Sequence, residues 1–190
     1  EQVKAYTEMK KAAITFFEEN VMTAASVLTQ MIRLHQIICG HVKTDDGEVK
    51  SIKSNRIKEL LEVLEETDGK VIIWAVYRYD IQEIERTLGE KYGKESVATY
   101  YGDTKDNLRQ SIVDRFMDAD DPLRFFVGNP KTGGYGLTLT SSHTVVYYSN
   151  DYSLEVRLQS EDRAHRIGQT SKVTYVDLMA DHTIDEKIVK

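Results

Sequence analysis

The sequence predicts an α/β domain built on an open parallel sheet with helices on both faces. From residue 70 onward, short apolar runs of five to eight residues alternate with amphipathic helical patterns. Strands that are apolar on both faces are typical of a parallel sheet between two helical layers. The length of 190 residues suits one compact domain, which buries roughly 70% of the surface of its unfolded chain.

The first elements are expected to be helices. Apolar positions recur at helical spacing over Val3–Phe17 and over Val21–Ile38, which predicts a helical hairpin. Gly40–Lys53 contains the turn sequence DDG and is expected to be a loop. Ser54 is then expected to cap a third helix that runs to about Glu66.

Five apolar runs and four helical patterns follow. The runs are VIIWAVY (71–77), SVATYY (96–101), RFFVGN (124–129), HTVVYYS (143–149) and KVTYVDLM (172–179), and the helices are expected over 80–92, 105–117, 153–164 and from 183. Ligands of open parallel sheets bind beyond the carboxyl ends of the strands. The loops after Tyr77, Tyr101, Val127 and Ser149 are therefore the expected site. We divide the chain into a helical insertion with its connecting loop (1–53) and an α/β lobe (54–190).

The charge of the chain is unevenly distributed. The net charge of −6 argues against a protein that coats nucleic acid, because such domains usually carry a basic excess. Residues 59–128 contain nine lysines and arginines against sixteen aspartates and glutamates, a net of −7, whereas residues 129–172 carry a net of +1. The acidic surplus therefore lies away from the later motifs.

The cysteine content and the chain start indicate the setting. Cys39 is the single cysteine, which excludes an internal disulfide, and the sequence has no export signal and no apolar run of about 20 residues that spans a membrane. We expect a reducing intracellular location: cytoplasmic, nucleoid-associated or nuclear. The sequence starts at Glu1 with a helical pattern, so we expect a piece of a longer protein.

The segment NPKTGGYGLTLT, residues 129–140, has three glycines within four positions, at Gly133, Gly134 and Gly136. Glycine allows positive φ and a close approach of backbone N–H groups to a ligand, which is how a loop presents donors to phosphate oxygens. A tight strand-to-helix connection with nothing bound explains the glycines equally well. No Gly-Lys-Ser/Thr sequence ends the segment, so it is not a nucleotide P-loop.

The segment QSEDRAHRIGQT, residues 159–170, places Arg163 and Arg166 three residues apart near the end of the helix expected over 153–164. Residues three apart share a helical face, and guanidinium groups grip phosphate through a fork of N–H donors. On spacing alone, a solvated helix face is the more common explanation.

The residues themselves resemble a known family. Gln159 and the run DRAHRIGQ (162–169) resemble motif VI of the Swi/Snf family of superfamily 2 helicase-like ATPases, whose pattern is Q-x-x-D-R-A-H-R-I-G-Q. KVIIWAVY resembles motif IV, YYGDTKDNLRQSIVDRF resembles the D-G-S-T-x-x-x-x-R-x-x-x-x-x-F segment, and TGGYGLTLTSSHTVVYYSNDYS resembles motif V with its following strand. IRLHQIICGHV is similar to the family's L-R-Q-I-C-x-H-P helix. The resemblance covers nearly the whole chain and implies the second, RecA-like lobe, with the helical hairpin as an insertion beside its sheet.

The resemblance implies an ATP site shared between two lobes. ATP and Mg²⁺ are then held mainly by an N-terminal RecA-like lobe, whose Gly-Lys-Thr loop and Asp-Glu-x-His box do not occur in these 190 residues. Arg163 and Arg166 match the family's arginine fingers, and Gln159 matches the glutamine expected near the γ-phosphate. Gly134 and Gly136 match the motif V glycines that couple the nucleotide to the nucleic-acid track. We expect the chain alone to lack appreciable ATPase activity.

The resemblance also implies a partner, double-stranded DNA, along which ATP hydrolysis moves the protein without strand separation. The positions that match nucleic-acid contacts are Thr104, Lys131, Thr132 and Gly133. Contacts to phosphates position a protein without reading sequence. The chain departs from the family at Asn129–Pro130, where Ser-Thr is usual, and at Ala75, where serine is frequent, which leaves the strand contacts open.

Other functions and sites have less support. A non-catalytic docking module for DNA or protein is one alternative, and another superfamily 2 repair or restriction translocase is a second, which the long DRAHRIGQ match disfavours. His35, Cys39 and His41 lack a fourth zinc ligand and are expected to pack. Trp74 is expected in the core. His165 is expected to orient motif VI through a hydrogen bond.

Overall fold

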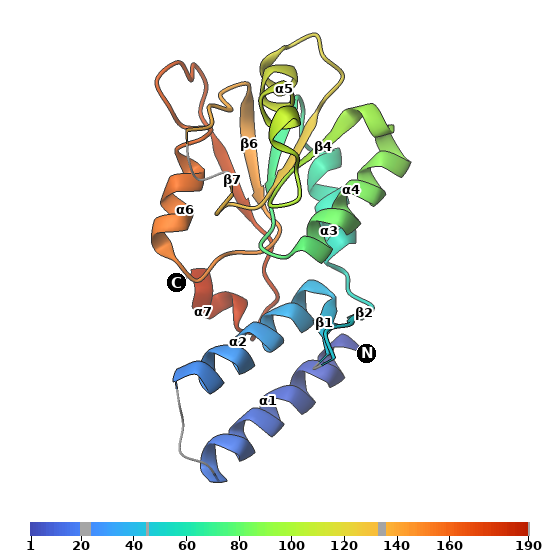
Figure 1. Cartoon of the computed structure of the whole chain (residues 1–190), viewed down its shortest axis with the longest axis vertical. Helices are drawn as coiled ribbons and strands as arrows, with labels where there is room; N and C mark the ends of the chain where they lie inside the picture. Colours follow the sequence, from blue (N-terminus) through green and yellow to red (C-terminus); the bar gives the residue numbers. More distant parts are fainter. Residues whose placement is uncertain (20–23, 45, 133–135, 190) are drawn as a thin grey trace. The chain divides into compact units, whose positions relative to one another are not determined.

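The structure is a computed structural model that describes residues 1–19, 24–44, 46–132 and 136–189 (Figure 1). The chain divides into two compact units, one formed by Glu59–Leu178 and the other by Glu1–Lys58 together with Met179–Lys190. The larger unit holds the sheet, and the smaller unit holds the first two helices. Each unit is described by itself below.

The larger unit contains the predicted parallel sheet. Its five strands run in the order β4-β5-β3-β6-β7, and every neighbouring pair is parallel. The strands are β3 (Lys70–Trp74), β4 (Val97–Tyr100), β5 (Phe125–Gly128), β6 (Ser142–Tyr147) and β7 (Thr174–Asp177). In the central register, Ile72 of β3 lies opposite Phe126 and Val145. The strand β3 lies in the middle of the sheet, and all of its residues but the first are therefore buried. The continuous apolar run predicts this burial.

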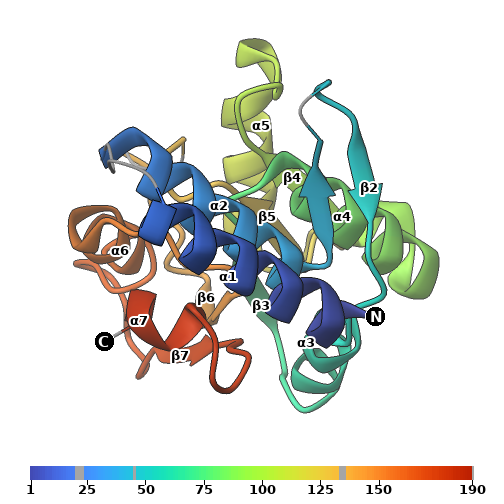
Figure 2. The same cartoon turned by 90° about the horizontal axis from the view of Figure 1, so that it is seen from below.

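Helices cover both faces of this sheet, as expected for a RecA-like lobe. The helices are α3 (Arg56–Glu65), α4 (Arg78–Tyr92), α5 (Asp106–Met117) and α6 (Leu154–Glu161), with a short 3₁₀ turn, η1 (Lys94–Ser96). Seen along the strands, α3 and α4 lie on one side of the sheet and α5 and α6 on the other (Figure 2). The α/β class and the RecA-like architecture predicted from the sequence are confirmed.

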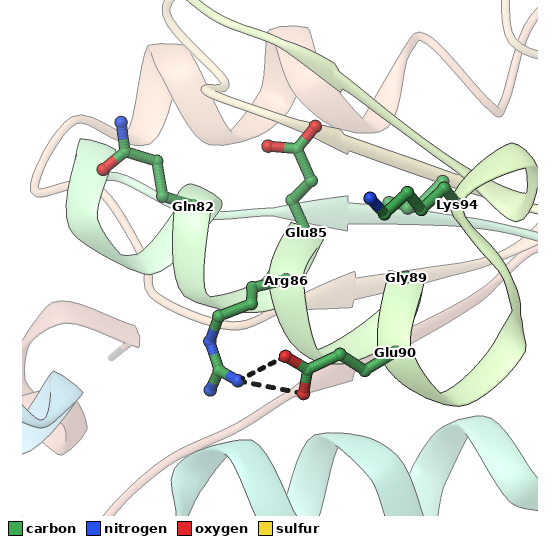
Figure 3. A pocket seen from close by; sticks show the side chains of 7 residues that line it. Gln82, Glu85, Arg86, Gly89, Glu90 and Lys94 are labelled. Atoms are coloured by element: carbon green, nitrogen blue, oxygen red, sulfur yellow. Dashed lines mark hydrogen bonds and ion pairs between the residues drawn. The ribbon is translucent and has the colours of Figure 1, made fainter.

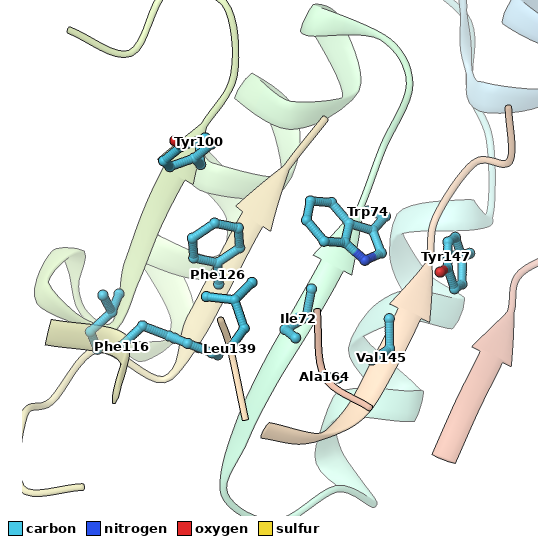
Figure 4. Close-up of a cluster of buried hydrophobic side chains, with 10 residues drawn as sticks. Ile72, Trp74, Tyr100, Phe116, Phe126, Leu139, Val145, Tyr147 and Ala164 are labelled. Carbon is cyan, nitrogen blue, oxygen red and sulfur yellow. The ribbon is translucent and has the colours of Figure 1, made fainter. Parts of the chain in front are cut away.

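One face of the sheet carries a compact aromatic and aliphatic core (Figure 4). Trp74 meets Phe126 edge to ring with centroids 5.9 Å apart, and Phe126 stacks on Tyr100 at 5.5 Å. Leu139 and Ala164 are fully buried in the same cluster, although both come from the loop segments that carry the sequence motifs. Trp74 is a core residue, as expected, and the core anchors two segments of the site.

Gly128 closes this core where β5 passes Trp74. A Cβ atom at residue 128 lies 2.8 Å from a ring carbon of Trp74 and 3.0 Å from the carbonyl oxygen of Tyr100. We therefore expect Gly128→Ala to lower the free energy of unfolding by about 1–3 kcal/mol, the usual cost of overpacking. Urea denaturation measures the change. Gly89→Ala is the control, since its Cβ meets nothing closer than 3.7 Å, and alanine in a helix is favoured by about 0.5–1 kcal/mol. Equal effects at both sites contradict the prediction.

The smaller unit begins with the predicted helical hairpin. Its elements are α1 (Gln2–Glu19), α2 (Ala24–Cys39), β1 (His41–Lys43), β2 (Val49–Ser51) and α7 (Asp185–Val189). The prediction that Gly40–Lys53 is a loop was wrong, because β1 and β2 pair there as antiparallel strands. Three-residue strands are too short to show an alternating pattern, and the glycines at 40 and 47 adopt positive φ where the chain turns.

The segment after β7 belongs to this smaller unit. Asp185 of α7 forms a buried ion pair with Arg56, and its other carboxylate oxygen lies 3.5 Å from His35 Nε2. The backbone N–H of Ile184 donates to the Tyr6 hydroxyl at 3.0 Å. Side chains from the first 60 residues thus fix the last helix. The final helix was expected from residue 183 and begins at Asp185.

His35, Cys39 and His41 are buried in this unit, as packing residues are. Within the described ranges, no group of three His, Cys, Asp or Glu side chains is placed to hold a metal ion. Among the same residues, no helix is both long enough and apolar enough to cross a bilayer.

Candidate functional site

The glycine segment (129–140) and the arginine segment (159–170) are joined by a backbone hydrogen bond. The Leu139 N–H donates to the Arg163 carbonyl at 2.9 Å, and the neighbouring Ala164 packs with Leu139 in the core. This bond ties the segment after β5 to the segment after α6.

The side chain of Gln169 adds hydrogen bonds to the connection between these two segments. Its Nε2 donates to the carbonyl oxygens of Thr140, Ser142 and Ala164 at 3.2, 3.0 and 3.1 Å. One carboxamide thereby spans the start of β6 and both motif segments. The sequence placed Gln169 within motif VI but gave it no role, because its three acceptors are backbone atoms that no pattern of side chains reveals.

Helix α6 begins as expected but ends early. Ser153 caps it by accepting a hydrogen bond from the Val156 N–H, whereas the helix ends at Glu161 rather than at Ala164. After Glu161 the N–H groups of Arg163 and Ala164 bond the carbonyls three residues earlier, at Ser160 and Glu161, so the chain continues as tight turns. The expectation that Arg163 and Arg166 share a helical face was wrong, because both lie in the turns after α6.

The two guanidiniums nevertheless converge on one atom. Nη1 of Arg163 and Nη1 of Arg166 each lie 3.4 Å from the Leu137 carbonyl oxygen, and Arg166 Nη1 also donates to Thr138 Oγ1 at 3.1 Å. Arg163 is 8% exposed, while Arg166 is exposed. Burial, together with the neighbouring charge of Arg166, lowers the pKa of Arg163. Two positively charged guanidinium groups held side by side are suited to bind an anion.

The remaining residues expected near the nucleotide are less closely grouped. Gln159 lies on α6 and donates to Glu155, one turn earlier, at 2.9 Å. Gly136 is exposed and has a φ of 80°, a conformation that glycine adopts readily. Gly133 and Gly134 lie outside the described residues. His165 is exposed beside Ala164.

Hydrogen bonds join the loops at the carboxyl ends of the central strands. Asn129, after β5, donates from Nδ2 to the Val76 carbonyl at 2.8 Å, and Ser149, after β6, accepts from the Val76 N–H at 2.9 Å. The Asn129 Oδ1 also accepts from the Lys131 N–H at 2.9 Å. Asparagine at the position where the family has serine therefore acts as a link between loops.

The charged groups on these loops are paired. Lys131 Nζ lies 2.8 Å from Asp151, and 61% of the lysine side chain is exposed. Arg78, at the start of α4, pairs with Asp103 in the loop after β4 at 2.7 Å. Sequence reasoning missed Arg78, whose only signal is its place just beyond a strand. The Thr132 N–H closes the turn onto the Asn129 carbonyl at 3.1 Å.

Thr104 uses its hydroxyl inside its own loop. The hydroxyl donates to the Thr99 carbonyl at 3.0 Å and accepts from the Tyr101 N–H at 3.0 Å. Helix α5 was expected from Lys105 and begins at Asp106. Arg109 donates to the Thr104 carbonyl at 3.1 Å. Thr104 therefore shapes the loop after β4 through its side chain.

Arg157, in the middle of α6, connects this helix to neighbouring elements. Sequence reasoning also missed this residue. Its guanidinium bonds Glu161 at 2.6 Å, Asn150 at 2.8 Å and both carboxylate oxygens of Asp177, and it lies 3.6 Å from the centroid of the Tyr147 ring. Burial acts against the charge of Arg157, but the hydrogen bonds to Asp177 and Glu161 outweigh it and raise its pKa. The spacing of Arg157 and Glu161 is a visible helical pair, whereas Asp177 is distant in sequence.

A surface hollow of about 480 Å³ lies elsewhere, along the outer side of α4 (Figure 3). It is lined by Gln82, Glu85, Arg86, Gly89, Glu90, Lys94 and Val97. Arg86 is paired with Glu90 along the helix. None of the candidate site residues lines this hollow, so it is separate from the carboxyl ends of the strands.

The arginines do not lie in the loops at the carboxyl ends of the strands: they contact residues 137–138, which precede the amino end of β6. A parallel sheet of this order with helices on both faces is typical of the class of RecA-like lobes. The model of the helicase conserved C-terminal domain matches residues 52–168, and the chain belongs to this family. Its relatives place it further as a second RecA-like lobe of the Swi/Snf family of helicase-like ATPases.

Three comparisons show the extent of the similarity. "ATP-dependent helicase fft2" of Schizosaccharomyces pombe is 30% identical over 92% of this chain, which spans 13% of that relative. The structure of "the C-terminal part of Fun30 ATPase domain" is 28% identical, with a TM-score of 0.65 over 72% of this chain and 45% of that one. The "SWI2/SNF2 ATPase core in complex with dsDNA" of Sulfolobus solfataricus shares the fold, with 24% identity and a TM-score of 0.77 over 99% of this chain and 40% of that one.

Proposed function

We propose that this chain is the second lobe of an ATP-driven translocase on double-stranded DNA, and that Arg163 and Arg166 act as its arginine fingers. The convergence of both guanidiniums on the Leu137 carbonyl carries this proposal. Membership of the Swi/Snf family supports it, as does the description of relatives as ATP-dependent helicases. The location of the protein then follows its DNA, in the nucleoid or the nucleus.

The chemistry assigned to this chain is the stabilisation of charge. ATP and Mg²⁺ are held mainly by the N-terminal RecA-like lobe in this proposal, and closure of the two lobes brings Arg163 and Arg166 to the γ-phosphate. A pair of guanidiniums fits the oxygens of a phosphoryl group, and an arginine finger contributes about 10³–10⁵ in rate. Gln159 and the glycines at 134 and 136 complete the nucleotide side. The chain by itself is then inactive.

The link between motif segments supports coupling of hydrolysis to DNA. The glycine segment leads from Lys131, on the proposed DNA track, to Leu139, whose N–H holds the Arg163 carbonyl. In this proposal, the bond between Leu139 and Arg163 connects the arginine side of the site to the segment that follows the DNA track. Hydrolysis reopens the lobes and moves them along one strand of the duplex.

The proposed DNA track comprises Thr104, Lys131, Thr132 and Gly133. Lys131 is the clearest of these, because its side chain is largely exposed and its partner Asp151 is a group that a DNA phosphate replaces. Such a contact positions the lobe on the duplex without reading its sequence.

A salt titration tests the track. We expect Lys131→Ala to weaken DNA binding and to lower the slope of log K against log salt by about 0.9, the contribution of one phosphate contact. Lys94→Ala is the control, because Lys94 lines the hollow beside α4. The measurement uses the protein that contains both lobes. An unchanged slope for Lys131→Ala removes this residue from the track.

The test of the ATPase proposal is the DNA-stimulated ATP turnover of Arg163→Ala and Arg166→Ala in the protein that contains both lobes. Full turnover in both variants favours a docking module with no catalytic part.

A further inference from the structure

We propose that Thr138 is a positioning residue for Arg166: its hydroxyl holds the guanidinium beside the Leu137 carbonyl in the orientation used for catalysis. This inference rests on the proposed function of Arg166 as an arginine finger.

Arg166 needs such a partner because its side chain is exposed. A free arginine samples many rotamers, and fixing it costs up to about 2 kcal/mol of entropy. The 3.1 Å bond from Nη1 to Thr138 Oγ1 is the shorter of its two contacts, since the Leu137 carbonyl lies at 3.4 Å. The hydroxyl therefore sets the direction of the guanidinium.

Thr138 directly precedes an anchored residue. Its neighbour Leu139 is fully buried in the core and bonded through its N–H to the Arg163 carbonyl. Threonine is stiff at χ1 because it branches at Cβ. The same short segment thus fixes the backbone of Arg163 and the side chain of Arg166, which keeps the two guanidiniums in register with each other.

The chemistry of the two acceptors, the Thr138 hydroxyl and the Leu137 carbonyl, favours a role in orienting Arg166 over a role in neutralising its charge. A hydroxyl and a carbonyl orient a guanidinium without neutralising its charge, and a neutral hydrogen bond contributes only about 1 kcal/mol. A carboxylate partner would cancel much of the charge and hold the side chain more strongly. Arg166 therefore keeps its full positive charge for a phosphate while its direction is restricted.

The test is a double-mutant cycle on DNA-stimulated ATP hydrolysis by the protein that contains both lobes. Thr138→Val keeps the shape of the side chain and removes the hydroxyl. We expect it to lower kcat about tenfold, as a small misplacement of a catalytic group does, with KM for ATP changed less than about twofold. Thr138→Ser restores the hydroxyl and is expected to keep kcat within about threefold of the wild type.

The coupling to Arg166 gives the decisive arm. In an Arg166→Ala background, Thr138→Val is expected to have no further effect on kcat, because the group that it positions is already gone. Thr174→Val is the matched control, since Thr174 is an exposed residue of β7. Thermal denaturation checks that each variant is folded, and Thr138→Ala replaces the valine variant if the latter does not fold.

Different results overturn different statements. If Arg166→Ala loses turnover and Thr138→Val keeps it, the inference about Thr138 is wrong and the finger assignment stands. A tenfold loss that persists in the Arg166→Ala background shows a general structural role and also overturns the inference. If Arg166→Ala keeps full turnover, Arg166 is not a finger and the inference about Thr138 is wrong, and if Arg163→Ala keeps full turnover as well, the proposed function itself fails.

Discussion

Replacement of Arg166 by alanine is expected to lower DNA-stimulated ATP turnover by about 10³-fold or more while the fold stays intact. The size of the loss is that of a missing arginine finger, whose charge is required as phosphoryl transfer develops negative charge on the γ-phosphate oxygens. Arg166 is exposed and bonds two neutral acceptors, so its removal leaves no buried charge behind. Steady-state turnover with saturating DNA measures the effect.

Arg163→Ala is expected to lose turnover to a similar extent and also to lower the free energy of unfolding by about 1–2 kcal/mol. Arg163 is largely buried against the Leu137 carbonyl, so alanine removes packing as well as charge. Arg163→Lys serves as the intermediate variant, since it keeps the charge and loses the planar fork. Wild-type turnover in both alanine variants would falsify the finger assignment. A loss in one variant alone assigns the catalytic charge to that arginine.

The second large effect is expected at Arg157. We expect Arg157→Ala to lower the free energy of unfolding by about 2–3 kcal/mol, because the change leaves Asp177 and Glu161 without their shared cation in a partly buried place. The stacking on the Tyr147 ring is lost as well. Urea denaturation followed by circular dichroism measures the stability.

Arg86 offers the matched control for Arg157. It is itself exposed and also pairs with two carboxylates of α4, Glu83 and Glu90, the latter drawn in Figure 3. Exposed helical ion pairs are weak because water screens them, so Arg86→Ala is expected to lower the free energy of unfolding much less than Arg157→Ala. Comparable losses for Arg86→Ala and Arg157→Ala would contradict the view that burial decides the strength of the Arg157 network.

A loss of stability at Arg157 also bears on catalysis. Arg157 anchors α6, and the turns after α6 carry both proposed fingers. The Tyr147 hydroxyl and Ser160 Oγ lie 2.7 Å apart in the same region, which adds a second tie between β6 and α6. We infer that the position of the fingers depends on these contacts between α6 and the sheet, as well as on Leu139 and Gln169.

The class of fold could be predicted from the sequence because the signal is local. A run such as VIIWAVY is apolar throughout and makes a buried strand wherever it is placed in a parallel sheet. The early end of α6 could not be predicted, because the turns that follow it are fixed by a bond from the Leu139 N–H to the Arg163 carbonyl, and Leu139 lies on a distant segment. The β1–β2 hairpin was missed because three-residue strands carry no periodic pattern.

The candidate site divides in the same way. The sequence by itself determined the order of motifs and, through it, the family. It also singled out Arg163 and Arg166 as candidate residues, since the motif match depends only on residue types and spacing. The tertiary structure decided which atoms meet: both guanidiniums at Leu137, Thr138 beside Arg166, and Asn129 bonded to Val76. The physical reason is the strand order β4-β5-β3-β6-β7, which places loops from distant parts of the chain side by side. Contacts between such loops follow from the crossover connections of the sheet, and no local pattern encodes them.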